Sequence, residues 1–320
     1  MLKEYFKNFE RFPVVPILGY PALPSLKIST QECLLDPEKH FNVAKYIFQE
    51  YKIDSILTLL DLTVEAEALG ARVKYAEYEA PQIIEHVQEP CYRETEKMKA
   101  YVKTVRMLKV FSNDVPVGAY ITGPYTAAGQ TIGIEKLVLL SHRQEEKAKV
   151  VLEKVTETVK DYAKKLEEVG VDYVIIAEPT SSLLSKENFK KHSKPYLKNL
   201  TKELKTETIL HICGKSKHLL EEVPDTGVAG ISVDQNIPLY EAATILKKDF
   251  LIFGNYPPAN LANEHPKTIK ENVEKMLNQV QDKENIVAST GCDIPAKTPP
   301  ENIKTFIQAV KSIKKKNYVA

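Results

Sequence analysis

Short apolar runs alternate along the chain with longer segments in which apolar residues recur every three or four positions. The first pattern is typical of buried parallel strands, and the second is typical of helices that cover a sheet. The apolar runs lie at residues 13–18, 53–60, 115–121, 171–177, 208–212, 228–233, 250–254 and 286–290. Eight strands that alternate with helices predict an α/β protein with a single (β/α)8 barrel, also called a TIM barrel.

The helical segments that complete this pattern are expected at residues 36–51, 92–111, 134–169, 186–204, 216–223, 239–246, 266–281 and 299–313. Asp36 and Thr298 each precede a proline and are predicted to be helix N-caps. A short N-terminal extension precedes the first strand. Residues 65–91 form an insertion after the second strand, with a hairpin expected around residues 71–74, and the glycine-rich residues 123–134 are expected to form a mobile loop.

The composition limits the classes of partner. With 44 Lys and Arg residues against 43 Asp and Glu residues, the formal net charge is +1, which argues against nucleic acid as a partner. No apolar stretch approaches the roughly 20 residues needed to span a bilayer, so no membrane association is expected. Four cysteines in 320 residues are too few for a disulfide framework. We therefore expect a cytoplasmic protein, with residues 1–320 forming one domain.

Three possible metal ligands lie at the ends of predicted strands, where barrels of this kind carry their active sites. His211 and Cys213 end the fifth strand, and Cys292 follows the eighth. Residues two apart on an extended segment point to the same side. One imidazole and two thiolates are three of the four ligands that zinc accepts, which leaves one position open for catalysis. The alternative interpretation is a core histidine beside cysteines that act as small hydrophobic residues.

Other polar residues also follow predicted strands. We assign Glu178 and Asp234 to the catalytic group, and Asp61, Asn255 and Tyr256 to the binding of substrate or cofactor. Asp61 and Glu178 could instead orient His211, and an Asp directly after a strand is often a helix cap.

Several strings also carry a family resemblance. HICG (211–214), VIIAEP (174–179), LIFGNYPP (251–258) and STGCDIPAKTPPENI (289–303), together with residues 36–73, resemble the corrinoid methyltransferase branch of the uroporphyrinogen decarboxylase superfamily. The resemblance implies a zinc ion held by His211, Cys213 and Cys292, with Asp234 as the candidate fourth ligand or a neighbour. It also implies methyl transfer from methylcobalamin to a small thiol such as coenzyme M.

The residues support parts of this interpretation. Two thiolates cancel the charge of zinc, so an incoming thiol that loses its proton there stays electron-rich and nucleophilic. No Asp-x-His-x-x-Gly motif for cobalamin is found, so the donor is expected on a separate corrinoid protein. Decarboxylases of the superfamily hold substrate carboxylates with an N-terminal arginine, and residues 17–24 contain none. The alternatives are a corrinoid-linked methyltransferase with another donor or acceptor, such as a methoxylated or methylthiolated substrate, a decarboxylase-type lyase, and a non-enzymatic barrel that binds a partner.

Overall fold

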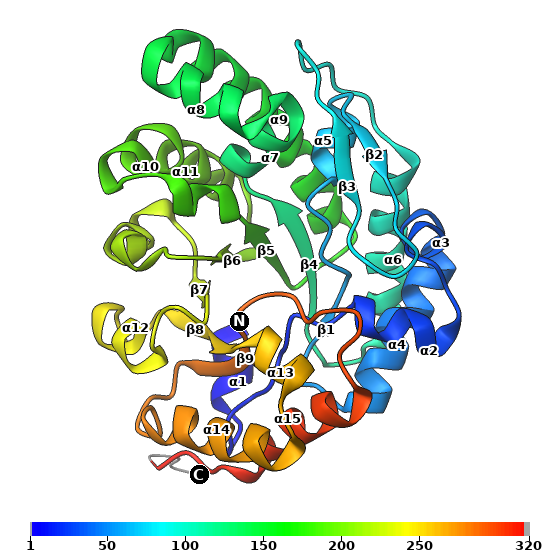
Figure 1. Cartoon of the computed structure of the whole chain (residues 1–320), viewed down its shortest axis with the longest axis vertical. Helices are drawn as coiled ribbons and strands as arrows, with labels where there is room; N and C mark the ends of the chain where they lie inside the picture. Colours follow the sequence, from blue (N-terminus) through cyan, green and yellow to red (C-terminus); the bar gives the residue numbers. More distant parts are fainter. Residues whose placement is uncertain (1, 317–320) are drawn as a thin grey trace.

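A computed structural model describes residues 2–316 of the chain. Parallel strands form a curled sheet at the centre of the molecule, and helices surround it on the outside (Figure 1). In spatial order the strands are β1 (Ile56–Leu57), β4 (Val117–Thr122), β5 (Tyr173–Ala177), β6 (Glu207–Ile212), β7 (Gly230–Val233), β8 (Leu251–Tyr256) and β9 (Ile286–Thr290).

Residues 13–15 lie between the two edges of this sheet and close the barrel. The amide of Val15 donates to the carbonyl of Ala288 in β9 at 2.9 Å, and the amide of Asp54, before β1, donates to the carbonyl of Val14 at 3.0 Å. The sequence predicts a regular strand here, but prolines at both ends of the segment have no N–H to donate. Only an isolated bridge between Val14 and Ala288 therefore forms. The predicted (β/α)8 barrel is confirmed, with one of its eight positions held by this short segment.

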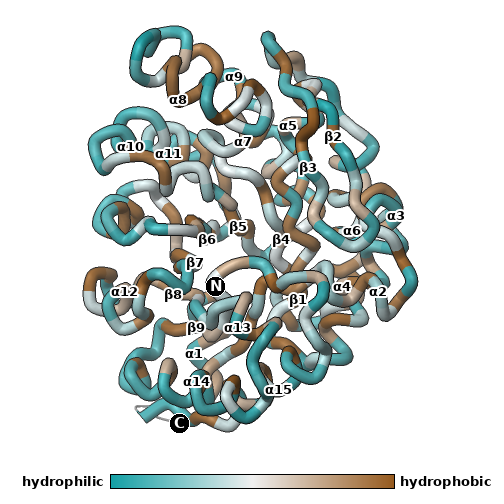
Figure 2. The backbone as a smooth tube through the Cα atoms, in the orientation of Figure 1, coloured by the Kyte–Doolittle hydropathy of each residue, from teal (hydrophilic) through white to brown (hydrophobic). Residues whose placement is uncertain are grey.

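Every second residue of each strand points into the barrel, and the residues that do so here are mostly apolar. These inward residues include Val15, Ile17, Leu57, Tyr120, Tyr173, Ile175, Ile209, Leu251, Phe253 and Val287. The N-terminal extension forms α1 (Leu2–Lys7), which closes one end of the barrel: Leu2 and Phe6 join the same cluster, and the Phe6 ring meets Phe253 edge-on at 5.8 Å. Figure 2 shows that hydrophobic segments concentrate in the central strands and hydrophilic ones along the outer helices.

The outer helices are α4 (Pro37–Tyr51), α6 (Glu96–Phe111), α9 (Glu145–Glu168), α11 (Lys194–Glu203), α12 (Leu239–Ile245), α14 (Pro266–Asn278) and α15 (Pro300–Ser312). Further helices lie in the connections: α2 (Leu23–Leu26), α3 (Thr30–Leu35), α5 (Val64–Ala68), α7 (Pro124–Ile132), α8 (Ile134–Arg143), α10 (Lys186–His192) and α13 (Pro258–Asn263). Asp36 caps α4 as predicted, since its carboxylate accepts from the amides of Glu38 and Lys39. Thr298 is not a cap, because α15 begins one residue later with Pro299 in the N-cap position.

The predicted insertion is confirmed as an antiparallel hairpin of β2 (Arg72–Lys74) and β3 (Gln82–Glu85), so residues 72–74 form a strand and the turn follows them. The amide of Val87, just beyond β3, donates to the carbonyl of Thr131 in α7 at 2.9 Å. The expected mobile loop at 123–134 is wrong: most of it is the buried helix α7. None of the helices within residues 2–316 combines the length and apolar character that crossing a membrane requires.

Candidate metal centre

The structure brings the three predicted metal ligands together at the C-terminal ends of β6 and β9. His211 Nε2 lies 2.9 Å from Cys213 Sγ, and Cys213 Sγ lies 3.1 Å from Cys292 Sγ. One ligand atom from each residue lies within 4.8 Å of the others. His211 is buried, whereas Cys213 and Cys292 are partly exposed.

The donor set fits zinc. In a tetrahedral site with ordinary zinc–ligand distances, two sulfurs lie about 3.8 Å apart, and a nitrogen and a sulfur lie about 3.6 Å apart. The separations here are shorter, at 3.1 Å and 2.9 Å, so a tetrahedral ion requires the ligand atoms to move apart by well under 1 Å. In the metal-free arrangement, the contact between the sulfurs raises the pKa of Cys213 and lowers the pKa of Cys292, while burial acts to raise both. The pair therefore favours holding one proton between two sulfurs.

Ser232 contacts one of the candidate ligands and was not among the residues that the sequence indicated. Its Oγ lies 2.9 Å from His211 Nδ1, and the two residues are direct neighbours in the β6–β7 register. A hydrogen bond on Nδ1 fixes the orientation of the ring and directs Nε2 toward the sulfurs. The available signal was a lone polar residue inside the apolar run at 228–233.

Asp234 lies near the cluster but outside the group of converging ligand atoms. Its Oδ1 accepts hydrogen bonds from the backbone amide of Asn236 at 2.8 Å and from the side-chain amide of Asn236. Its charge acts to raise the pKa of Cys213, which places it in the electrostatic neighbourhood of the site. Asn255 donates to the backbone carbonyls of Asp234 and Ile237, so its amide holds the loop after β7 in place.

Glu178 follows β5 and binds the N-terminus of α7. Its carboxylate accepts from the amide of Tyr125 at 3.1 Å, and from the amide and hydroxyl of Thr126 at 2.6 Å and 2.5 Å. These bonds satisfy amides that a helix leaves unpaired at its start. Burial raises the pKa of Glu178 to about 7 against the lowering effect of these bonds.

Asp61 and Tyr256 are also engaged elsewhere. The Asp61 carboxylate forms a fully buried ion pair with Lys97 at 2.9 Å, and Lys97 also contacts Glu67 at 2.9 Å. The Tyr256 hydroxyl donates to Glu264 at 2.7 Å, and its ring packs against Phe306 of α15. Of the eight predicted site residues, the structure therefore brings together His211, Cys213 and Cys292, whereas the side chains of the other five bond to groups outside this cluster.

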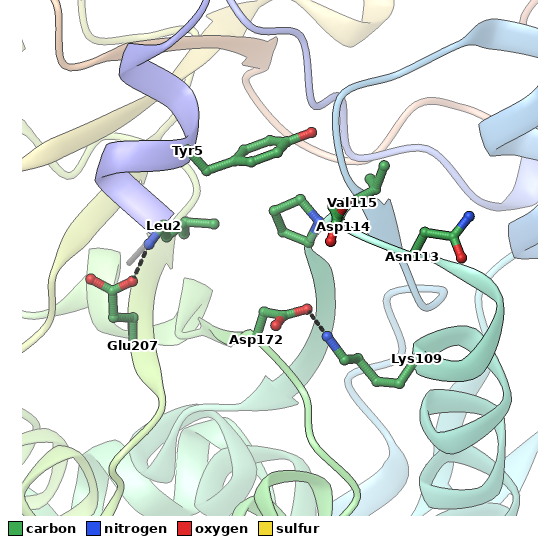
Figure 3. A pocket seen from close by; sticks show the side chains of 9 residues that line it. Leu2, Tyr5, Lys109, Asn113, Asp114, Val115, Asp172 and Glu207 are labelled. Carbon is green, nitrogen blue, oxygen red and sulfur yellow. Dashed lines mark hydrogen bonds and ion pairs between the residues drawn. The ribbon is translucent and has the colours of Figure 1, made fainter.

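A cavity of about 450 Å³ lies at the opposite end of the barrel (Figure 3). It is lined by residues that precede or begin β4, β5 and β6 and by Leu2 and Tyr5 of α1. Lys109 pairs with Asp172 at 2.6 Å there, and the Leu2 amide donates to Glu207. This cavity belongs to the floor of the barrel, whereas the cluster of His211, Cys213 and Cys292 lies where the strands end.

Known proteins are similar to this chain over most of its length. The methylcobamide:CoM methyltransferase MtbA of Methanosarcina acetivorans is 29% identical over 301 residues, which cover 88% of this chain and 87% of that protein. The methylated-thiol–coenzyme M methyltransferase of Methanosarcina mazei is 26% identical over 293 residues, which cover 86% of this chain and 78% of that protein. These relatives confirm the predicted enzyme class, a methyltransferase.

A solved structure supports the fold. A methyltransferase from Methanosarcina mazei superposes with a TM-score of 0.86 at 21% identity and covers 97% of both chains. The family model described as uroporphyrinogen decarboxylase (URO-D) matches residues 6–313. Because this match spans nearly the whole sequence, the chain belongs to the uroporphyrinogen decarboxylase family.

Proposed function

We propose that this protein is a zinc-dependent methyltransferase that moves a methyl group from a methylated corrinoid to a small thiol such as coenzyme M. The observation that carries the proposal is the convergence of His211, Cys213 and Cys292 at the open end of the barrel. The names of the relatives, methylcobamide:CoM and methylated-thiol–coenzyme M methyltransferases, support both the donor and the acceptor. We further propose that the corrinoid is carried by a separate protein.

The residues of the site divide the work. His211, oriented by Ser232, would supply an imidazole nitrogen, Cys213 a sulfur from the same end of β6, and Cys292 a sulfur from the end of β9. Zinc, when bound by these three residues, would lower the pKa of an added thiol and keep it in the nucleophilic form. The fourth position, which these three residues leave to another ligand, is where that thiol would bind.

Asp234 has a different role in this proposal. Its Oδ1 already accepts two hydrogen bonds from Asn236, so we propose it as a charged neighbour of the metal and not as a permanent ligand. A negative charge close to the cluster favours a cation in the site. Glu178 and Asp61 would then act at a distance: Glu178 holds the start of α7, and Asp61 ties the segment after β1 to Lys97 of α6.

The main alternative is a corrinoid-linked methyltransferase with another donor or acceptor, and the relative that is named for methylated thiols favours it. A decarboxylase-type lyase is less supported, because residues 17–24 contain no arginine to hold substrate carboxylates. Methyl transfer from methylcobalamin to a panel of thiols, with and without methylated thiols as donors, separates these possibilities.

Replacing one ligand tests the proposal directly. We expect Cys292→Ala to lose most of its zinc and its thiol methylation, because only two protein ligands remain. Cys91→Ala is the matched control, since Cys91 is exposed and lies outside the cluster. Zinc content by mass spectrometry and methylation of coenzyme M by methylcobalamin are the two measurements. Full zinc occupancy with full activity in Cys292→Ala would refute the assignment.

A further inference from the structure

The two cysteine sulfurs of the candidate metal centre lie close enough for a second kind of chemistry. Cys213 follows β6 and Cys292 follows β9, which are separated in the sheet by β7 and β8, yet their sulfurs lie 3.1 Å apart. A covalent link between them would join two distant strand ends across the mouth of the barrel. It would also remove two of the three metal ligands at once.

The separation lies between two end points. A disulfide needs a sulfur–sulfur distance of about 2.05 Å, and a tetrahedral zinc site needs about 3.8 Å. From the observed 3.1 Å, the two sulfurs must approach by about 1 Å to form a disulfide, and they must move apart by less than 1 Å to bind zinc. Each cysteine has a glycine neighbour, and Gly214 already adopts a φ of 83°, a left-handed conformation that favours glycine.

The other two cysteines offer no comparable pair. Cys33 is fully buried in the core and Cys91 is exposed on the insertion, and neither contacts another sulfur within residues 2–316. Cys213 and Cys292 are both partly exposed residues, unlike Cys33, which favours access of a small oxidant from solution. The reactive pair is thus confined to the candidate metal centre.

We propose that Cys213 and Cys292 are a reversible redox site, which closes to an intramolecular disulfide in the presence of hydrogen peroxide and thereby excludes the metal. One sulfur attacks an oxygen of peroxide and becomes a sulfenic acid. The O–O bond breaks, and the other oxygen leaves as the first water. The second sulfur attacks the sulfenic sulfur, the S–S bond forms, and a second water leaves. Peroxide accepts the two electrons, and both thiol protons end in water. Two added thiols, such as those of dithiothreitol, reverse the step.

This inference rests on the proposed function in one respect, which is that zinc is the ion that holds the sulfurs apart. Metal binding and disulfide formation then compete for the same two sulfurs. Oxidation would switch the methyltransferase off without unfolding it, and reduction in the presence of zinc would restore it.

The test uses the full-length protein in zinc-loaded form and after removal of metal with EDTA, each treated with hydrogen peroxide. For the metal-free protein we expect the intact mass to fall by two hydrogens, and the free thiols to fall from four to two per chain. We expect digestion to give a linked peptide pair that contains Cys213 and Cys292. For the zinc-loaded protein we expect slower loss of thiols, with zinc released as the link forms.

Three variants serve as controls. Cys213→Ser and Cys292→Ser should give no linked peptide, and Cys91→Ser should give the same linked peptide as the unchanged chain. The inference is wrong if the metal-free protein gains oxygen atoms without a linked peptide, or if the link involves Cys33 or Cys91. It is also wrong if dithiothreitol does not reverse the change.

The outcome is independent of the methyl transfer assay. A protein that forms the Cys213–Cys292 link but binds no zinc and methylates no thiol would refute the proposed function and leave the redox site standing. A protein that binds zinc and methylates thiols, but gives no link when metal-free, would do the reverse.

Discussion

At the scale of single residues, the orientation of His211 in the candidate metal centre depends on a hydrogen bond with Ser232, a residue outside the cluster. Ser232 Oγ lies 2.9 Å from His211 Nδ1 and is buried with it. Without this contact the ring can rotate, and its tautomer is no longer fixed. We expect Ser232→Ala to lower zinc affinity by roughly 10- to 100-fold, as is usual when a hydrogen-bond partner of a ligand is lost.

The measurement is a competition titration with a chromophoric zinc chelator. Ser216→Ala is a suitable control, because Ser216 is also buried near Cys213 but donates to the backbone carbonyl of Ile212 instead of a ligand. Equal zinc affinities for the Ser232 and Ser216 variants would show that the β6–β7 contact does not orient His211.

At the scale of elements, two buried carboxyl groups hold the end of β4 and the start of α7. Glu178 binds the amides at the N-terminus of α7, and Glu65 accepts from the amide of Thr122 at the end of β4. Burial raises the pKa of each glutamate to about 7, from an ordinary value of 4.5. Between these two pH values the folded protein binds more protons than the unfolded chain, so its stability falls as the pH rises.

Glu178→Gln removes the titration of one of these groups. The Gln side chain keeps an oxygen for Thr126 but cannot accept from the Tyr125 amide as well, which is a loss at every pH. The unchanged chain loses stability as the pH rises, whereas the variant lacks this contribution. We therefore expect the difference in unfolding free energy, variant minus unchanged chain, to increase by up to roughly 3 kcal/mol from pH 4.5 to about pH 8. Urea unfolding at several pH values measures this. Parallel curves of unfolding free energy against pH for the two proteins would contradict it. Glu65→Gln should change the pH dependence of stability in the same direction.

The same elements show what can be predicted from the sequence. The apolar runs locate most strands of the barrel. The ends of these runs and the residues just after them include all three converging ligands, because parallel strands end at one face. The helix α7 could not be predicted, since its start is stabilised by Glu178, which lies far away in the sequence. The roles of Asp61 and Tyr256 depend on Lys97 and Glu264, partners that no local pattern indicates.

At the scale of the whole molecule, the two ends of the barrel have separate tasks. Helix α1 closes the floor with Leu2 and Phe6, and the candidate metal centre lies at the other end of the strands. Phe6 is 1% exposed and packs edge-on against Phe253 of β8. Phe6→Ala removes a buried ring and leaves a cavity, so we expect the free energy of unfolding to fall by about 3–5 kcal/mol.

This separation predicts that the same variant, while folded, binds zinc with unchanged affinity, because Phe6 packs against Phe253 of β8 whereas the metal ligands lie at the C-terminal ends of β6 and β9. Urea unfolding and a zinc competition titration on one preparation check both halves of the prediction. Val110→Ala is the control for truncating an apolar side chain, since Val110 is 83% exposed on α6 and should change stability by less than about 0.5 kcal/mol. A loss of zinc affinity in Phe6→Ala that matched its loss of stability would mean that the layers of side chains inside the barrel transmit strain from the floor to the metal ligands.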